Sequence, residues 1–255
     1  MILKKIKSIC SLVLGSMLVL TACDKGFEQP GSYSSFAVIH ASPVSSTSPT
    51  DTIHVFLDTA KYSSTGTTYL NNTGYLPVAS GSRPVNLRRK GVYTSDLYAS
   101  TFTNDFESGK AYSFFVYDTT TSPTGTAKVL QLKDDLTLPA PNMAHIRVLH
   151  LAPRGPAVDI VLVRTTTPAN QDSITLANKT YIGAEPNATL LSPFTPVTRG
   201  TYIVKIKAAG TQTVLISTTV ALTPAADLNI GRIVTIFVTG TAKGRPLTIG
   251  TFRHY

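Results

Sequence analysis

The chain has 255 residues and a formal net charge of +9, and its length suits one large domain or two domains of ordinary size. Its only two cysteines, Cys10 and Cys23, both lie near the N-terminus. The rest of the chain has no thiol, which excludes disulfides, thiolate nucleophiles and thiolate metal sites there.

The first 22 residues are typical of a secretory signal peptide. A basic stretch at residues 1–7 precedes an uncharged run at 9–22. The run is too short for a membrane-spanning helix, which needs roughly 20 apolar residues. Removal of this segment takes away three lysines and lowers the formal charge from +9 to +6. We expect no nucleic-acid partner for an exported protein of this kind.

The signal region ends in the sequence LTAC at residues 20–23. This sequence resembles the lipobox of bacterial lipoproteins, in which the cysteine thiol takes up a diacylglyceryl group after cleavage. The alternative is ordinary cleavage after Ala22 with an incidental cysteine. With Cys23 as the lipid attachment site, polar residues 23–35 form a flexible lipidated tether. The predicted location is the cell envelope, with the lipid in the outer membrane.

From Phe36 onward the pattern is typical of β-strands and almost free of helix. At residues 201–207 apolar side chains alternate with threonine and lysine, as in a strand with one buried face. Two segments, 111–117 and 231–238, are apolar at nearly every position. These two segments are predicted to be central strands.

Four landmarks recur in the same order in both halves of the chain, which indicates an internal duplication. They are VIHASP at 38–43 and VLHLAP at 148–153, the strands at 53–57 and 158–162, LPVASG at 76–81 and TPVTRG at 195–200, and GKAY at 109–112 and GRIV at 231–234. Each half has about seven strand candidates, the size and count of an immunoglobulin-like sandwich.

The predicted fold class is therefore all-β, with two tandem immunoglobulin-like antiparallel β-sandwich domains after the signal peptide and tether. The boundaries are 1–22 for the signal peptide, 23–35 for the tether, 36–133 for domain 1, 134–143 for a proline-stiffened linker and 144–255 for domain 2. The rival, one large sandwich or barrel, does not explain the ordered recurrence.

The histidine–proline strand ends, the strand AVDIVL at 157–162 and the linker LKDDLTLP at 132–139 resemble the bacterial surface domain called domain-of-unknown-function family 4397. The first half departs from the pattern, with His54 in place of Asp159 and an insertion at 44–50. The resemblance implies a duplicated β-sandwich on an exported or lipid-anchored protein, and it implies no known chemistry.

The repeated histidines, His40 and His150, are the first candidates for chemistry. Strand parity places each on the inner face just before a proline, where the imidazole can bond to loop carbonyls. Metal binding would need further ligands, and parity places His54 on the outer face. We therefore expect both histidines to be structural, with no metal site.

Motifs of enzymes are missing from the sequence, which has neither the G-x-S-x-G nor the H-E-x-x-H pattern. No glycine-rich loop opens a helix, and no evident carboxylate pair marks a glycosidase. We expect neither catalytic residues nor a cofactor. A hydrolase with a distant carboxylate pair stays a third hypothesis.

Tyrosines gather in the first half, where they could form a ligand-binding loop by stacking on sugar rings. They are Tyr62, Tyr69, Tyr75, Tyr93 and Tyr98. The alternative is that they are ordinary strand residues with a solvated tip.

Four tripeptides have the form Asp-Ser/Thr followed by an aliphatic residue or threonine, as at O-glycosylation sites of some exported bacterial proteins. The hydroxyls concerned are those of Thr52, Thr59, Thr119 and Ser173. The same tripeptide is also an ordinary strand entry.

Taken together, the sequence predicts a non-enzymatic, lipid-anchored envelope protein. Its partners would be the membrane, through the N-terminal lipid, and a glycan or an envelope protein, bound by loops at the distal ends of the sandwiches, chiefly 44–50 and 62–98. The alternative is a structural or accessory subunit of an outer-envelope complex.

Overall fold

The computed structural model describes residues 32–43, 52–89, 97–118, 127–165, 173–183, 186–222 and 232–254. The predicted signal peptide, Cys23 and most of the tether lie outside the described residues, as does the insertion at 44–50. The regular secondary structure of the described part consists of strands and one short helix, α1 (Ala188–Leu191). Within these residues, no helix is both long and apolar enough to cross a membrane.

The first half forms a sandwich of two four-stranded sheets, with strand orders β4-β1-β7-β8 and β3-β2-β5-β6. Its strands are β1 (Tyr33–His40), β2 (Ile53–Leu57), β3 (Ala60–Lys61), β4 (Leu76–Ala79), β5 (Gly81–Arg89), β6 (Leu97–Phe106), β7 (Ala111–Tyr117) and β8 (Lys128–Asp134). All neighbouring strands in it run antiparallel except β1 and β7, which pair parallel.

The second half repeats this arrangement, with strand orders β12-β9-β15-β16 and β11-β10-β13-β14. Its strands are β9 (Met143–His150), β10 (Val158–Arg164), β11 (Ser173–Lys179), β12 (Thr195–Thr198), β13 (Gly200–Ala208), β14 (Val214–Leu222), β15 (Ile233–Thr239) and β16 (Thr248–Arg253). Each sheet order equals that of the first half with every strand number raised by eight. The parallel pair is again the first strand with the seventh, β9 with β15.

The two halves also share their register. His40 lies opposite Val116 in the parallel pair of the first half, and His150 lies opposite Val238 in that of the second. The predicted fold class, two tandem immunoglobulin-like β-sandwiches, is confirmed. Each half has eight described strands where the sequence indicated about seven. In the first half, the two-residue β3 is too short to leave a pattern.

The first strand begins at Tyr33, three residues before the predicted start at Phe36. Ser34 and Ser35 gave no apolar signal, yet Ser34 Oγ donates to Glu107 O (2.5 Å) and Ser35 N donates to Lys110 O (3.0 Å). The connection between the halves is the segment 135–142, because β8 ends at Asp134 and β9 begins at Met143.

Each sandwich encloses an apolar core between its two sheets. In the first half the core includes Phe36, Phe106 and Phe114, and in the second it includes Tyr202 and Ile236. All of these side chains are essentially buried. The parity prediction for 201–207 is confirmed, since Tyr202 and the alternate residues after it point into this core.

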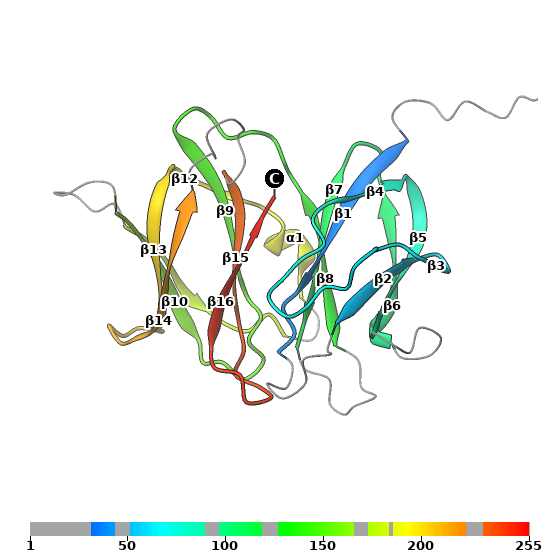
Figure 1. The fold of residues 1–255 in the computed structure, drawn as a ribbon. Coiled ribbons are helices and arrows are strands. Elements are labelled where there is room, and N and C mark those ends of the chain that lie inside the picture. Colours follow the sequence, from blue (N-terminus) through cyan, green and yellow to red (C-terminus); the bar gives the residue numbers. More distant parts are fainter. Residues whose placement is uncertain are drawn as a thin grey trace, which may run out of the picture.

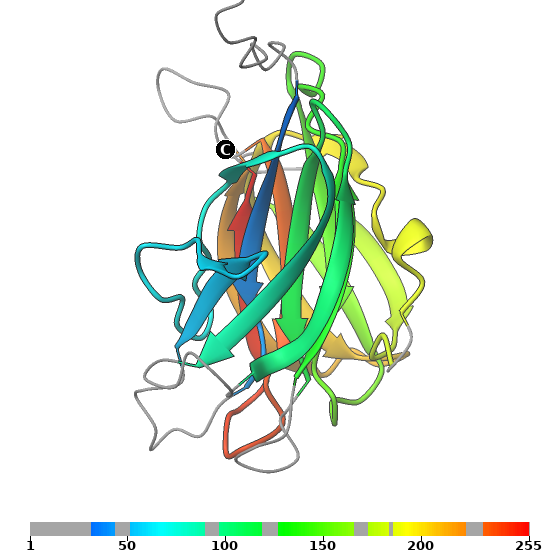
Figure 2. The same cartoon turned by 90° about the vertical axis from the view of Figure 1, so that its right-hand side faces the viewer.

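The two sandwiches pack against each other, so that the four sheets form four layers (Figure 1). A third apolar cluster lies between the sheets that contain β1 and β9, and joins Ile39 and Phe115 to Leu149, Phe237 and Phe252 from the second half. Figure 2 shows the first half in front of the second when the view is turned.

This junction explains why two strands are apolar on both faces. Every residue of β7 and of β15 is buried, because one face meets the sandwich core and the other meets the junction. The prediction that these segments are central strands is thus confirmed. Phe115 meets Phe237 in an edge-to-face contact with ring centroids 5.7 Å apart.

Candidate binding groove between the two sandwiches

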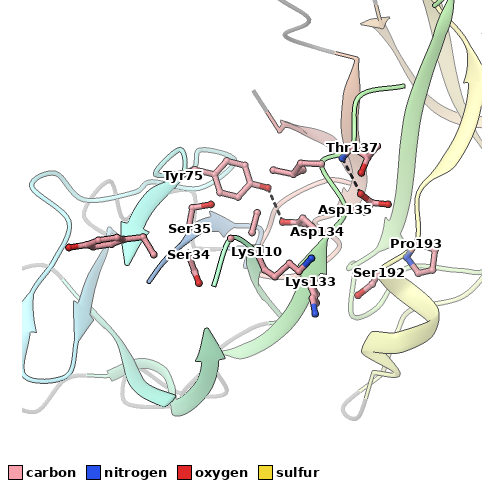
Figure 3. A pocket seen from close by; sticks show the side chains of 14 residues that line it. Ser34, Ser35, Tyr75, Lys110, Lys133, Asp134, Asp135, Thr137, Ser192 and Pro193 are labelled. Carbon is pink, nitrogen blue, oxygen red and sulfur yellow. Dashed lines mark hydrogen bonds between the residues drawn. The ribbon is translucent and has the colours of Figure 1, made fainter. Parts of the chain in front are cut away.

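An open groove of about 1020 Å³ lies at the end of the junction where β1 begins. Its walls come from the start of β1, the turn before β7, the end of β8, the connecting segment, and the residues after α1. They include Tyr33, Ser35, Tyr75, Lys110, Lys133, Asp134, Asp135, Thr137, Ser192 and Pro193 (Figure 3). Both halves of the chain therefore contribute to one concave surface, the usual form of a ligand site.

The inner wall of the groove is fixed by a buried ion pair between the halves. Arg147 Nη1 donates to Asp134 Oδ1 over 2.8 Å, and both side chains are 2% exposed or less. Arg147 Nη2 and Asp134 Oδ1 also bond to the Ser113 hydroxyl, at 2.9 Å and 3.0 Å. The guanidinium in addition stacks over Phe194, 4.5 Å from the ring centroid.

A hydrogen-bonded chain closes this ion pair into a ring. Arg147 Nε donates to Thr235 Oγ1 (3.0 Å), and Thr235 Oγ1 lies 2.9 Å from His254 Nε2. On its other side, His254 Nδ1 lies 2.6 Å from the Tyr75 hydroxyl, which donates to Asp134 Oδ2 (2.8 Å; Figure 3). Tyr75 and Asp134 of the ring come from the first half, and Arg147, Thr235 and His254 come from the second.

Proton counting fixes the state of His254. The Tyr75 hydroxyl gives its one proton to Asp134, so it accepts from Nδ1–H, and Nε2 then accepts from Thr235. Burial and the Arg147 charge hold the pKa of His254 well below its usual value, so the ring is neutral. Burial raises the pKa of Asp134, and the Arg147 bonds oppose that rise.

The outer rim of the groove is solvated and carries charges of both signs. Tyr33 is 52% exposed, and Lys110 is exposed beside it on the turn before β7. Hydrogen bonds from Thr137 lower the pKa of Asp135, which is therefore ionised at neutral pH. The rim thus offers an aromatic face, a cation, a carboxylate and hydroxyl groups to a ligand.

The predicted tyrosine cluster is dispersed by the fold. Tyr98 is buried in the first core, and Tyr69 packs partly buried against that core. Tyr75 lies in the junction ring, whereas Tyr62 is 37% exposed and stacks on Phe36 with ring centroids 5.8 Å apart. Tyr93 lies outside the described residues. Of the four that the structure describes, only Tyr75 lines the groove.

His150 is the last residue of β9, and its ring bonds to the loop that follows. Its Nδ1 accepts from Ala152 N (3.3 Å), so Nε2 carries the proton and donates to Pro156 O (3.0 Å). This is the kind of loop bond that the sequence suggested for both histidines. His40 is buried at the equivalent position and meets Tyr98 edge-on, with ring centroids 5.0 Å apart.

His54 lies on the outer face of its sheet as predicted, yet it is buried. The connection after β3 covers it: a Cβ atom at Gly66 would lie only 2.9 Å from His54 Nε2. Asp159, at the equivalent position of the second half, is half-buried and accepts from Asn178 N (2.8 Å) and Gly210 N (2.9 Å). Among the described residues there is no group of three or more side chains that could hold a metal ion.

Burial lowers the pKa of His150, which makes its contribution to stability depend on pH. In the unfolded chain the His150 imidazole takes up a proton near pH 6.5, whereas in the folded chain it does so only at lower pH. The stability that the neutral ring contributes above pH 6.5 is therefore lost as the pH falls. His150→Asn removes this dependence. We expect the stability advantage of the wild type over the variant, measured by urea denaturation, to shrink between pH 7.5 and 5.5; an advantage that grows would contradict this assignment.

Of the predicted O-glycosylation sites, Thr59 and Ser173 are exposed and Thr52 is buried. Thr59 and Ser173 are equivalent, because Leu57 pairs with Ala60 as Leu162 pairs with Ile174. Thr119 lies outside the described residues. Modification at Thr59 and Ser173 stays a prediction, whereas Thr52 is not accessible to an enzyme in the folded chain.

Sequence reasoning missed the junction ring. Asp134 was assigned to a linker, and Arg147 was not singled out at all. One signal was available: Arg147 is the only arginine, lysine or carboxylate in the mostly apolar segment 144–151, and an arginine buried in a strand needs a paired carboxylate. The partner itself depends on how the sandwiches dock.

The fold and groove define a class of protein: an all-β chain of two repeated sandwiches that presents an open cleft at their junction. The model of the family described as "Domain of unknown function (DUF4397)" matches residues 34–161, half of the chain. The chain belongs to this family. The family's description assigns no activity. No curated protein matches this chain.

Solved structures with a similar arrangement include the Bacillus anthracis TIE protein, at 9% identity and a TM-score of 0.23 over 81% of this chain and 34% of that one. This chain thus spans about a third of that protein. Two others, from Parabacteroides distasonis (7% identity) and Bacteroides uniformis (8%), are each called a "putative cell adhesion protein". Both have TM-scores of 0.25 and cover 88% and 87% of this chain and 98% of their own. At these values the likeness says nothing about what this chain binds.

Proposed function

We propose that this chain is a non-catalytic, lipid-anchored envelope protein that binds an oligosaccharide in the groove between its sandwiches. The observation that carries the proposal is the groove itself, an open cleft of about 1020 Å³ built by both halves. Its open form suits an extended ligand better than a small metabolite, which a protein usually encloses.

The chemistry of the rim supports a saccharide ligand. The exposed ring of Tyr33 provides a flat face for the C–H side of a sugar. Lys110, Asp135 and Thr137 supply donors and acceptors for sugar hydroxyls around it. The rim carries both signs of charge, so neutral sugars and sugar acids are both compatible with it.

The position of the groove fits a chain that is held by lipid at Cys23. Tyr33 lies ten positions after Cys23, a stretch that reaches at most about 35 Å when extended. The groove would then face the envelope near the membrane, where surface polysaccharide is attached. The sequence instead predicted that loops at the distal ends of the sandwiches bind the ligand. One of these loops, 44–50, lies outside the described residues.

The test uses the chain from residue 24 to 255 on a glycan array, followed by titration calorimetry with the best glycan. We expect Tyr33→Ala to weaken binding about tenfold, which corresponds to about 1.4 kcal/mol. Lys110→Ala should weaken it as well. Tyr62→Ala is the matched control, because Tyr62 is also exposed but lies outside the groove. Absence of any bound glycan, or equal losses at Tyr33 and Tyr62, would refute the proposal.

A further inference from the structure

The edge strand β14 presents an unusual open side. It is the last strand of its sheet, and among the described strands only β13 pairs with it. Val214 and Leu215 at its start are 47% and 41% exposed, and they belong to the few large apolar side chains that the described surface exposes. An edge strand with free backbone groups is a template for pairing with another strand.

Most other edges of the four sheets carry features that oppose such pairing. The edge strands β4 and β12 are four residues long and each contains a proline. The strand β3 has two residues, and β6 contains a charged residue and irregular register. By contrast, β14 has nine residues, VLISTTVAL, with no charge and no proline. Its pairing with β13 is regular from Ile216 to Leu222.

The backbone groups on the open side can be assigned. Ala221 O accepts a hydrogen bond from Arg253 Nη1 (2.8 Å), so this carbonyl points away from β13. Because the direction alternates along a regularly paired strand, the N–H and C=O groups of Thr219 and Ser217 point the same way. The side chains of Ser217 and Thr219 are exposed. The middle of β14 therefore offers consecutive donors and acceptors to an incoming strand.

The sequence of β14 is chemically symmetric about Thr218. Apolar residues lie at 214–216 and again at 220–222, with the hydroxyl residues Ser217, Thr218 and Thr219 between them. If two copies pair antiparallel about Thr218, Ser217 of one lies opposite Thr219 of the other, and each apolar position faces an apolar position. Ser217 and Thr219 both direct their backbone groups outward, which is the arrangement that antiparallel hydrogen bonding requires.

We propose that β14 is a homodimerisation edge, at which two copies of this chain join their outer sheets into one continuous eight-stranded sheet. The contact is isologous, because the same strand faces itself across a two-fold axis. A second copy suits the edge better than an unrelated strand. In the antiparallel pair the hydroxyl residues of one copy face those of the other, and the apolar ends of one copy face the apolar ends of the other. Lys205 and Lys207 on β13 lie roughly 14 Å from those of the other copy across the three strand spacings, beyond the screening length, and Arg253 lies at the Ala221 end of β14 rather than at its Ser217–Thr219 centre.

The test compares two variants that carry charges at the same exposed positions. The variant with Ser217→Lys and Thr219→Lys places like charges opposite each other across the axis. The variant with Ser217→Glu and Thr219→Lys places opposite charges there. Both are made in residues 24–255, which retain every described residue and contain no cysteine, so that a disulfide cannot produce a dimer. Circular dichroism checks that each variant folds.

Sedimentation equilibrium is measured up to about 1 mM, the range of the weakest specific associations. We expect a concentration-dependent dimer for the wild type, a monomer for the doubly lysine-substituted variant, and a dimer again for the Glu/Lys variant. A wild type that stays monomeric overturns the proposal. So does a dimer that persists in the lysine variant, which would locate the contact elsewhere. Thr175→Lys, on the opposite edge of the same sheet, serves as control and should leave the dimer intact.

Discussion

Replacing Arg147 by methionine is expected to lower the free energy of unfolding by about 3–5 kcal/mol, the usual cost of leaving a buried charge without its partner. Arg147 donates to Asp134, Ser113, Thr235 and the Ser192 carbonyl. The substitution leaves the Asp134 carboxylate buried and without its counter-charge. Urea denaturation followed by circular dichroism measures the loss.

Two controls separate this effect from loss of side-chain volume. The double variant Arg147→Met with Asp134→Leu removes both charges and should recover much of the stability. Lys133→Ala breaks the exposed ion pair with Glu107 beside the same groove and should change stability little. A small effect of Arg147→Met, comparable to that of Lys133→Ala, would show that the ion pair is not buried in solution.

Phe115→Ala is expected to cost about 3–5 kcal/mol and to uncouple the two sandwiches. Phe115 is fully buried in the junction and contacts Phe237 and Phe252 of the second half. Its loss leaves a cavity between the sandwiches rather than inside one of them. We expect the two halves to unfold at different urea concentrations in this variant, with increased hydrogen exchange in β7 and β15.

Phe114 provides the matched comparison, because it is the neighbouring residue with its ring on the opposite face of β7. Phe114 packs inside the first sandwich against Phe36 and Phe102. Phe114→Ala should destabilise by a similar amount, while the two halves stay docked. If both variants give the same unfolding profile, the junction does not couple the halves.

The repeat could be recognised from the sequence because it depends on local patterns. Equivalent strands of the two halves are marked by the histidine–proline strand ends, the proline–valine segments and the glycine turns. In the structure these strands pair in equivalent registers. Strand parity likewise placed Tyr202 inward and His54 outward, because side chains alternate along any strand. These features depend only on neighbouring residues.

The groove could not be predicted because it depends on how the halves dock. Asp134 and Arg147 are thirteen residues apart across a connecting segment, and nothing in their spacing says that they meet. The partners of Tyr75 show the same limit, since His254 lies 179 positions away. The tyrosines are close in sequence and suggested one surface. In the fold, Tyr98 lies in the core of the first sandwich, whereas Tyr75 lies at the junction between the sandwiches.

The junction and the proposed binding groove share residues. The residues that hold the sandwiches together at Asp134 also form the inner wall of the groove. A rigid junction keeps the rim residues Tyr33 and Lys110 at a fixed position relative to Ser192 of the second half. Such preorganisation lowers the entropic cost of binding.

Differential scanning calorimetry of residues 24–255 tests most directly whether the two sandwiches form one cooperative body. A single transition, with calorimetric and van't Hoff enthalpies that agree, is the result that a shared apolar layer and a buried ion pair predict. Two separate transitions, or a calorimetric enthalpy about twice the van't Hoff value, would mean that the sandwiches unfold independently. In that case the groove at their junction would have no fixed shape.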